Sequence, residues 1–543
     1  MKAIRLNGLR LTLDETQECL AAKAAGALGV RETDIISLAV IRKALDARRS
    51  RPPYFVYAVK ICLADSAVMP EKLSEGLQIL PCHDEPDIEP ASTGSSDVLR
   101  RPGVENLPVV VAGSGPAGLF AAYALAARSI HVLLLERGRP IEKRVEDVKK
   151  FWEGGILHPQ SNVLFGEGGA GTFSDGKLTS RTKNPYAGLV KKVMVEAGAP
   201  PAILTDAKPH IGTDKLRQVI VRMRKKLAAM GCVLQFEAQV TDFVIRQNEI
   251  AAVVVNGERE IKTNHVILAI GQSADDTYEK LYERGVKMEP KPFAMGLRVE
   301  HPQALINSIQ YGKWSGHSKL PPAEYFVTAA VDELNRSVYT FCMCPGGQVI
   351  GCSAFPGTVI TNGMSNRERS GEFANSAVVV NVRVEDFAGS GEPLNGLSFR
   401  SRWEREAFRA GGSNYCAPAQ KITDFLKNQS SGTLGRTSFL PGVKAAELAE
   451  VLPVFVADAL RKGIRQFDKK MPGFISEEAH LIGVETRTSS PLRICRGSDG
   501  QSESVRGLYP CGEGAGYAGG IISSALDGMK VAQSVIRALC GSP

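Results

Sequence analysis

The chain matches the glycine pattern G-x-G-x-x-G at three places, and such a pattern can bring a backbone close to a phosphate. The matches are GSGPAG (residues 113–118), GEGGAG (166–171) and GEGAGYAGG (512–520). Glycines allow tight turns and close approach of main-chain N–H groups, and a following helix adds the positive end of its dipole. Because one pattern with three matches identifies no ligand, the context of each match has to separate them.

The first match lies in the context of a dinucleotide-binding turn. LPVVVAG, from Leu107, and IHVLLLE predict two buried parallel strands on either side of a small-residue helix. We expect Gly113 to form the tight turn, Gly115 to let the backbone approach a pyrophosphate, and Gly118 to permit close packing of helix on strand. Glu136 ends the second strand, where a carboxylate would bind an adenosine ribose and disfavour a 2′-phosphate.

The segment from residue 213 to 271 predicts a helix capped by Thr213, then an antiparallel meander and a return strand ending in Ala269–Gly271. Asn256-Gly257 indicates a type I′ hairpin inside the meander. This order of elements resembles the FAD-binding fold of glutathione-reductase-like flavoproteins. The sequence therefore predicts an α/β protein with a Rossmann-type FAD-binding domain, an inserted α+β substrate domain and a small N-terminal α+β domain.

The other two glycine segments are interpreted through that fold. GEGAGYAGG follows a predicted strand and precedes a long amphipathic helix, with no acidic residue ending a later strand. We expect it to close over the ribityl, pyrophosphate and flavin portion of the FAD; a strand, turn and helix without ligand contact is the alternative. The GEGGAG segment continues through Thr172, Ser174, Asp175 and Lys177, and indicates either a loop that wraps the cofactor or a mobile surface loop.

The residues expected to bind the cofactor form one set drawn from these segments and from the return strand. They are Gly113, Ser114, Gly115, Pro116, Ala117, Gly118, Glu136, Arg137, Gly168, Gly169, Thr172, Ser174, Lys177, Val240, Ala269, Gly271, Gly512, Glu513, Gly519, Gly520 and Ile521.

Nearly the whole chain resembles a widespread family of bacterial FAD-dependent proteins, known as FAD-dependent dehydrogenases or NAD(P)/FAD-dependent oxidoreductases. The motifs that carry the resemblance are GSGPAGLFAA, LFGEGGAGTFSDGKL, PHIGTDKL, FCMCPGG, TNGMS, ETRTSSPLRI and PCGEGAGYAGGI. The resemblance implies bound FAD and indicates almost nothing about the substrate. Glu513 stands where the wider flavoprotein pattern has Asp, so its contact with the ribityl chain could be shifted or water-mediated.

The expected domains are an N-terminal α+β module (1–83), a linker (84–106), the first part of the FAD-binding domain (107–290), the inserted substrate domain (291–489) and the closing FAD-binding segment (490–543). In the inserted domain, SVYTFCMC and QVIGCSAF predict a hairpin through Pro345-Gly346-Gly347. Cys342 and Cys344 then share one face, either as packed thiols or as a redox pair that would close a strained ring.

A polar segment of the same domain indicates either a pocket wall or a solvated turn; its residues are Asn362, Ser365, Arg367, Arg369, Asn375 and Ser376. Arg487 and Arg493 could contact the cofactor or pair with acids. Structural roles are favoured for His158, His210 and His301 over acid–base roles. No catalytic residue is identified.

The remaining expectations, on location, thiol state and surface charge, follow from the composition. The 543 residues carry a net charge of +8, and no apolar run is long enough to cross a bilayer, so a cytosolic location is expected. The eleven irregularly spaced cysteines predict reduced thiols and no metal site. Arg42–Arg51 is the densest basic stretch, interpreted as a solvated surface rather than a nucleic-acid patch.

The expected function is an oxidoreductase that passes a hydride or electrons between FAD and a small organic molecule, with NAD(P)H as a transient donor to be tested. An RNA-associated flavoprotein and a non-catalytic protein with structural FAD are the alternatives, and the oligomeric state is left open.

Overall fold

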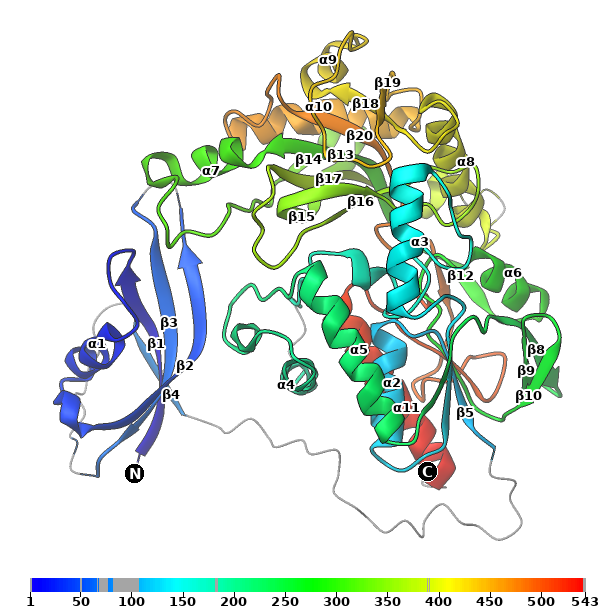
Figure 1. The fold of residues 1–543 in the computed structure, drawn as a ribbon, viewed down its shortest axis with the longest axis horizontal. Helices are drawn as coiled ribbons and strands as arrows, with labels where there is room; N and C mark the ends of the chain where they lie inside the picture. The colour runs from blue at the N-terminus through cyan, green and yellow to red at the C-terminus, as the bar shows by residue number, and fades with distance from the viewer. Residues whose placement is uncertain are drawn as a thin grey trace.

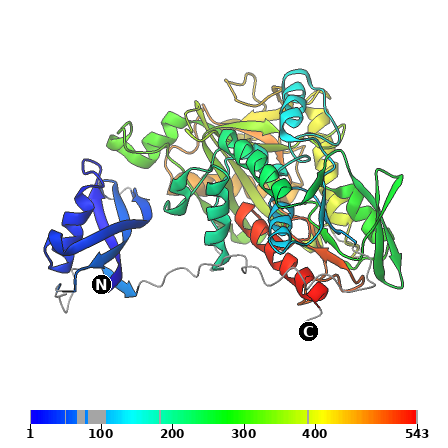
Figure 2. The ribbon, with the colours of Figure 1, turned by 60° about the horizontal axis from the view of Figure 1, so that its bottom comes forward.

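The computed structural model describes residues 2–48, 51–65, 67, 77–81, 107–180, 184–387, 389 and 391–540. Within these residues the chain builds three main sheets, and both views show the N-terminal sheet standing to one side of the two larger ones (Figure 1, Figure 2). The α/β class with a Rossmann-type domain is confirmed. The expected linker, residues 84–106, lies outside the described residues. In the described part of the chain, every helix is too short or too polar to span a lipid bilayer.

The N-terminal domain is one four-stranded antiparallel sheet with a helix on one face. Its elements are β1 (Lys2–Thr12), α1 (Cys19–Leu28), β2 (Ile35–Asp46), β3 (Tyr54–Leu63) and β4 (Gln78–Pro81), in the order β2-β3-β1-β4. Strand β3 lies between β1 and β2 in the sheet, so the connection from β1 to β2 through α1 crosses over β3. Lys43 on the edge strand β2 joins this domain to the rest: its N–H donates to Thr205 O (2.8 Å) and its carbonyl accepts from Ala207 N (2.8 Å).

The Rossmann-type domain is built on a five-stranded parallel sheet. Its strands, in spatial order, are β22 (Leu508–Pro510), β11 (Val266–Leu268), β5 (Val109–Ala112), β6 (Val132–Leu135) and β7 (Val233–Gln235). Strand β22, near the C-terminus, thus joins the same sheet as β5, the first strand of this domain. All residues of β5 and β6 are buried, as expected for parallel strands covered on both faces.

The two faces of this sheet carry different layers. Val109 and Val111 pack with the helices α2 (Pro116–Ala126), α4 (Tyr186–Glu196), α5 (Thr213–Ala229) and α11 (Ile521–Cys540). Val110 and Ala112 point to the opposite face, against α6 (Asp275–Glu283) and the meander β8 (Val240–Arg246), β9 (Glu249–Val255) and β10 (Arg259–Lys262). Asn256 (φ 54°) and Gly257 (φ 78°) form the predicted hairpin turn between β9 and β10.

The second large sheet is mixed and lies above the parallel sheet in Figure 1. Its strands follow the order β14 (Thr328–Val331), β15 (Arg336–Gly351), β17 (Phe373–Val382), β13 (Phe293–Pro302), β20 (His480–Glu485), β18 (Ala417–Lys421) and β19 (Val443–Ala445), with β16 (Thr361–Met364) paired to β15. The flanking helices are α7 (Gln303–Tyr311), α8 (Asn395–Ala410), α9 (Ile422–Lys427) and α10 (Val454–Lys470). The short pair β12 (Met288–Pro290) and β21 (Leu492–Ile494) marks where the chain enters and leaves this part.

Two sequence expectations about local structure are wrong. The segment Pro345-Gly346-Gly347 is no hairpin turn, because β15 continues through it, pairing first with β17 and then with β16. Gly346 (φ 50°) instead allows a bulge that brings the strand against Arg369, whose carbonyl oxygen would lie 1.7 Å from an added Cβ. Helix α5 is capped by Gly212 rather than Thr213, and the Thr213 hydroxyl donates to the carbonyl of Ser174.

Candidate functional site

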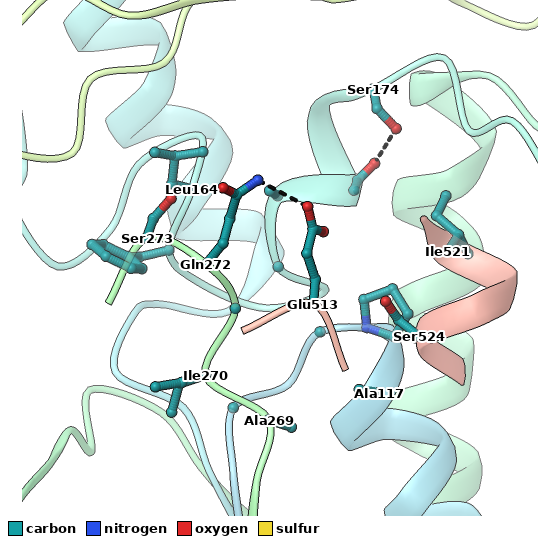
Figure 3. Close-up of a pocket in the computed structure, with 18 of the residues that line it drawn as sticks. Ala117, Leu164, Ser174, Ala269, Ile270, Gln272, Ser273, Glu513, Ile521 and Ser524 are labelled. Atoms are coloured by element: carbon teal, nitrogen blue, oxygen red, sulfur yellow. Dashed lines mark hydrogen bonds between the residues drawn. The ribbon is translucent and has the colours of Figure 1, made fainter. Parts of the chain in front are cut away.

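A cavity of about 410 Å³ lies between the two large sheets, within the range typical of cofactor pockets. One wall is formed by the segments that follow the carboxyl ends of β5, β6, β11 and β22, where ligands bind in open parallel sheets. The opposite wall comes from the mixed sheet and includes Phe341, Cys342, Thr361, Asn362 and Glu485. Figure 3 shows Ala117 and Ile521 at the starts of α2 and α11, on the same side of this cavity.

The three glycines of GSGPAG occupy different environments. A Cβ on Gly113 (φ 103°) would lie 2.3 Å from Ala269 O, and a Cβ on Gly118 would lie 1.8 Å from Gly113 O. Both positions are therefore closed to larger side chains, because the segment after β11 packs on Gly113 and helix α2 packs on the turn at Gly118. A Cβ on Gly115 would meet only Gly169 Cα, at 3.8 Å. Gly115 thus presents open backbone to the cavity at the N-terminus of α2, where helix N–H groups have no intrahelical acceptor.

The C-terminal glycine segment reaches the same cavity from the other end of the chain. Gly519 and Gly520 are exposed and line it; an added Cβ would have no neighbour within 4 Å at Gly519 and only Ser523 Oγ, at 3.9 Å, at Gly520. Helix α11 begins at Ile521 and crosses α2 closely, because a Cβ on Gly528 would lie 2.0 Å from Ala117 O. Two helix N-termini, separated by some four hundred residues of sequence, therefore converge on one cavity.

The GEGGAG segment covers the first glycine loop. Gly168 N donates to Ser114 O (3.0 Å), and Gly169 (φ 65°) lies so close that its Cβ would be 3.0 Å from Gly115 Cα. The segment is anchored on the mixed sheet by Asp175, whose side chain is 1% exposed. Asp175 accepts two hydrogen bonds from Arg369 (3.0 and 2.5 Å) and one from the Ser365 hydroxyl.

These contacts argue against a mobile surface loop. Burial pushes the pKa of the Asp175 carboxyl upward, but the charge of Lys177, 3.0 Å away, and the bonds from Arg369 outweigh it and hold that pKa far below its usual range. The polar segment that supplies Ser365 and Arg369 is likewise no solvated turn. Its Asn362 lines the cavity, and its Asn375 is buried and accepts a hydrogen bond from Arg298 (3.1 Å).

Most of the expected cofactor-binding residues line this cavity: Gly113, Ser114, Gly115, Pro116, Ala117, Glu136, Arg137, Gly169, Ser174, Lys177, Val240, Ala269, Gly271, Glu513, Gly519, Gly520 and Ile521. Four lie behind the lining, where they shape it: Gly118, Gly168, Thr172 and Gly512. Thr172, for example, donates to Glu167 O (2.9 Å) and accepts from Arg144. A contact of any of these residues with FAD stays a prediction.

The Glu136 carboxylate is buried and already accepts four hydrogen bonds. Ser114 supplies two of them, from N (2.9 Å) and Oγ (2.7 Å), and the amides of Gly138 (2.9 Å) and Gly166 (3.1 Å) supply the others. These donors occupy its four acceptor sites. Glu136 thus ties the first loop to the GEGGAG segment, and a ribose hydroxyl would have to replace one of these donors.

Arg144, in helix α3 (Ile141–Gly154), was missed by sequence reasoning. Its fully buried guanidinium donates to the carbonyls of Asn162 (2.8 Å), Val163 (2.9 Å) and Glu167 (2.5 Å), which fixes the start of the GEGGAG segment. Burial lowers the pKa of Arg144 to about 9, so it remains protonated at neutral pH. Its spacing from Val148 and Phe151 puts it on the apolar face of α3, and a charge on such a face is a signal in the sequence.

Gln272 and Glu513 meet across the cavity floor (Figure 3). Gln272 Nε2 donates to Glu513 Oε1 (2.8 Å) and to the carbonyl of Arg487 (2.7 Å), so it links the Rossmann-type domain to the mixed sheet. Burial raises the pKa of the Glu513 carboxyl to about 7, against the opposing hydrogen bond from Gln272 and the charge of Lys291.

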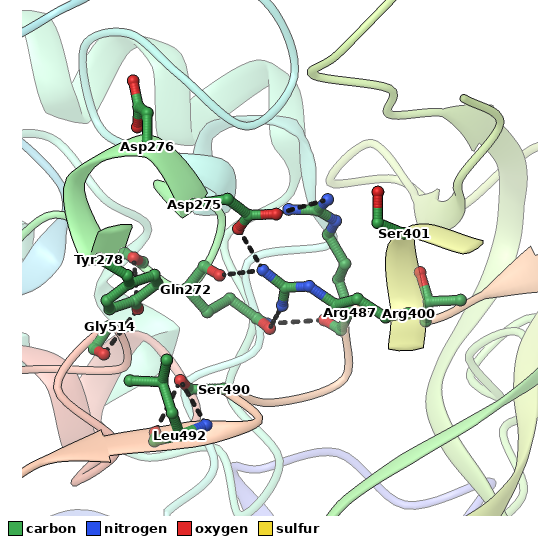
Figure 4. A network of polar contacts seen from close by, with 12 residues as sticks. Gln272, Asp275, Asp276, Tyr278, Arg400, Ser401, Arg487, Ser490, Leu492 and Gly514 are labelled. Carbon is green, nitrogen blue, oxygen red and sulfur yellow. Dashed lines mark hydrogen bonds and ion pairs between the residues drawn. The ribbon is translucent and has the colours of Figure 1, made fainter. Parts of the chain in front are cut away.

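A buried ionic network supports this junction (Figure 4). Arg400, fully buried on α8, donates to Gln272 O (2.8 Å) and pairs with Asp275 at the start of α6. Arg487 makes a bidentate pair with Glu404 (3.0 and 2.9 Å) and lies 3.6 Å from Asp275. The network fixes the two walls of the cavity relative to each other, and neither Arg400 nor Glu404 was singled out from the sequence.

The other residues weighed from the sequence lie away from the cavity wall. His158 Nδ1 accepts from Ser161 N (3.1 Å), His210 Nε2 lies 3.2 Å from Arg367 O, and His301 Nε2 lies 2.8 Å from Phe474 O. Each histidine thus contacts a main-chain group, close in sequence for His158 and distant in sequence for His210 and His301. Arg493 pairs at the surface with Glu289 (3.0 Å).

Comparison with known proteins identifies the class. The family model for the C-terminal domain of FAD-dependent proteins matches residues 292–488, and a model for NAD(P)-binding Rossmann-like domains matches residues 111–141. A domain of unknown function, DUF8436, matches residues 3–62. An uncharacterized protein of Clostridium beijerinckii is 42% identical over 537 residues, which cover 98% of this chain and 99% of the relative. The chain belongs to this family of FAD-dependent proteins.

Two solved structures illustrate the wider similarity. L-proline dehydrogenase from P. horikoshii is 12% identical, with 80% of this chain and 94% of that one covered and a TM-score of 0.33. Glycine oxidase from Bacillus cereus is 11% identical, with 79% and 97% covered and a TM-score of 0.31. Likeness at this level says nothing about substrate.

Proposed function

We propose that the cavity holds one FAD and that the protein passes a hydride or an electron pair between this FAD and a small organic substrate. The adenosine end would lie near Glu136, the pyrophosphate at the N-terminus of α2, and the ring-bearing half between Glu513 and the mixed sheet. When bound, the flavin would supply the two-electron chemistry, and the protein would supply orientation and electrostatics.

The observation that carries this proposal is the open backbone at both helix N-termini. Gly115 and Gly519 line the cavity, and an added Cβ would meet only Gly169 Cα (3.8 Å) at Gly115 and nothing within 4 Å at Gly519, whereas Gly113 and Gly118 are closed by packing. Open glycines at helix N-termini suit a phosphate group, which needs close approach of N–H donors. The residues present therefore fit a dinucleotide cofactor.

The mixed-sheet wall would face the substrate. Its polar side chains at the cavity are Thr361, Asn362, Glu485, Arg487 and Thr488. Arg487 is already paired with Glu404, and Glu485 accepts from Thr361 Oγ1 (3.3 Å). Burial raises the pKa of Glu485 to about 7, so its carboxyl can hold or release a proton near neutral pH. These groups would orient a polar substrate and exchange its proton.

NADH or NADPH is the electron donor to be tested. The two glycine turns that join a parallel strand to a helix in the described residues, GSGPAG and GEGAGYAGG, serve the same cavity, so a nicotinamide nucleotide would bind transiently rather than in a dedicated Rossmann unit. Glu136 lies at the proposed adenosine site of the FAD. Its charge disfavours a 2′-phosphate at that site only, and therefore does not distinguish NADH from NADPH as the transient donor.

The test is spectroscopic. Full-length protein purified without added flavin should show bound FAD by its absorbance, at one equivalent per chain. Anaerobic titration with NADH and with NADPH should then bleach that absorbance. A flavin that stays oxidised with both nucleotides would remove the nicotinamide-dependent version, and protein that neither retains nor takes up FAD would remove the proposal itself.

A further inference from the structure

We propose that Cys342, with Cys344 beside it, forms a thiol–disulfide exchange site that opens into the cavity and acts on low-molecular-weight disulfides. The inference deepens the proposed function by naming a substrate class, and it rests on that function only for the electrons that would restore the dithiol. Neither residue was expected to bind the cofactor.

The first argument is the placement of the two cysteines. Cys342 lines the cavity and is half-buried, whereas Cys344 is fully buried behind it. Cys342 has a left-handed backbone (φ 48°), which is rare for a residue with a side chain, and β15 shifts register between Phe341 and Cys344. Non-glycine residues held in this conformation gather at functional sites. Because of this shift, Cys342 and Cys344 do not follow the regular strand alternation expected from the sequence.

The second argument is the set of contacts that hold this distorted segment. Arg298 Nη2 donates to the carbonyl of Cys342 (2.9 Å), and Cys344 Sγ approaches the same oxygen (3.4 Å). Lys177 Nζ donates to the carbonyl of Met343. Arg298 is fully buried, and its guanidinium also contacts Glu485 (3.4 Å). Two cations from different elements thus fix the carbonyls of two consecutive residues, Cys342 and Met343, at the cavity wall.

The third argument is the charge state that these neighbours impose. A hydrogen bond from the Cys344 thiol, aided by the charges of Lys177 and Arg298, lowers the pKa of Cys342 to about 5 despite burial. The same hydrogen bond and burial raise the pKa of Cys344 well above its usual value. At neutral pH the pair is therefore one thiolate and one thiol. The charged or titratable groups around it are Lys177, Arg298, Asp175, Glu485 and Glu513.

A third cysteine of the same cavity shows that the position is special. Cys352 also lines the wall, but its thiol is buried and donates to Ile360 O (3.5 Å), and burial raises its pKa far above the usual range. Thiolates, not thiols, are the nucleophiles. Burial likewise raises the pKa of Cys511, the remaining cysteine of the lining. Among the described cysteines that line the cavity, only Cys342 therefore combines a cationic surrounding with a second thiol in contact.

In this exchange the substrate disulfide is itself the oxidant, so no other oxidant is needed. The Cys342 thiolate attacks one sulfur of a disulfide RSSR, forming a mixed disulfide and releasing one RS⁻. Cys344 gives up its proton and attacks the Cys342 sulfur, which forms the Cys342–Cys344 disulfide and releases the second RS⁻. The protein dithiol is oxidised by two electrons and the substrate disulfide is reduced by two. Restoring the dithiol takes two electrons and two protons. Reduced FAD would supply the two electrons.

The first experiment uses the purified full-length protein and iodoacetamide. Peptide mapping should show Cys342 alkylated at a rate nearly constant from about pH 6 to 9, with Cys352 unlabelled as an internal control. At pH 6 we expect alkylation about tenfold faster than for the same residue in urea-unfolded protein, because the gain in thiolate outweighs the weaker nucleophile. In Cys344→Ala the rate should instead rise with pH, since the donor to the thiolate is gone. A profile that inflects at the pH of an ordinary thiol, or equal labelling of Cys352, would overturn the assignment.

The second experiment uses hydroxyethyl disulfide and intact-mass measurement. The wild type should lose two hydrogen atoms and release two thiols per chain, Cys344→Ala should stop at the mixed disulfide, and Cys342→Ser should do neither. Exchange that proceeds equally in Cys342→Ser would refute the site. FAD content is read from absorbance on the same samples. Exchange in a protein that binds no FAD would refute the proposed function alone. An FAD-loaded protein without exchange would refute this inference alone.

Discussion

Replacing Asp175 by Asn should loosen the loop that covers the cofactor cavity. The buried Asp175 carboxylate faces two cations, Lys177 at 3.0 Å and Arg369 at 2.5 Å, and it also accepts from the Ser365 hydroxyl. Asparagine has nearly the same shape but carries no charge. The substitution would therefore leave Lys177 and Arg369 without their shared counter-ion.

The magnitude follows from the cost of buried, uncompensated charge. Removing one partner of a buried ion pair destabilises by about 3–5 kcal/mol. Lys177 is partly exposed, and water would recover part of the loss at that residue, so we expect about 3 kcal/mol. The depressed pKa of Asp175 means that its contribution is fully present above about pH 4, the unfolded value, and shrinks as the pH falls further.

The assay is urea unfolding of Asp175→Asn and wild type without added FAD, at pH 7 and at low pH, followed by FAD titration of the folded proteins. Glu258→Gln, an exposed carboxylate in the β9–β10 hairpin, is the matched control and should change stability by less than about 0.5 kcal/mol. We expect a large loss at pH 7 that narrows toward pH 3, and weaker FAD binding. A loss no greater than that of the control would refute the reasoning that Asp175 anchors this loop.

Three further perturbations test other parts of the site. Gly118→Ala should destabilise by about 1–3 kcal/mol or more, because its Cβ would lie 1.8 Å from Gly113 O, whereas Gly115→Ala should leave the melting temperature unchanged without FAD; equal melting shifts would contradict this. The pKa of Glu513 is raised from 4.5 to about 7, so the folded state resists its ionisation and stability falls as pH rises through this window. Glu513→Gln should therefore gain up to about 3 kcal/mol relative to wild type by pH 8, and parallel stability–pH curves would oppose that sign. Gln272→Leu should cost about 1–3 kcal/mol in urea unfolding, since Arg487 O and Glu513 lose their donor, and an unchanged midpoint would count against the junction.

Local patterns predicted the Rossmann-type half of the fold well. The apolar runs before GSGPAG and up to Glu136 became β5 and β6, because buried parallel strands require continuous apolar residues. Asn256-Gly257 became the expected hairpin turn, since both residues adopt positive φ readily. The widely separated segments GSGPAG and GEGAGYAGG were also expected to share one ligand, and both line one cavity.

Features set by distant partners could not be predicted. Pro345-Gly346-Gly347 has the composition of a turn, but its neighbours β16 and β17 keep it in a strand. The Arg400 and Arg487 network joins segments more than a hundred residues apart, and no spacing in the sequence reveals such pairs. The left-handed backbone of Cys342 likewise depends on Arg298, which lies on another strand.

The central claim is that two widely separated segments, GSGPAG and GEGAGYAGG, bind a single FAD. The most direct measurement is equilibrium FAD titration of wild type, Gly115→Val and Gly519→Val, with melting temperatures recorded without flavin. An added Cβ has no neighbour within 4 Å at Gly519 and only Gly169 Cα, at 3.8 Å, at Gly115, so both variants should still fold, and the melting temperatures check this. The account predicts one FAD per wild-type chain and an affinity at least tenfold lower in each variant. Unchanged affinity in either correctly folded variant would contradict it.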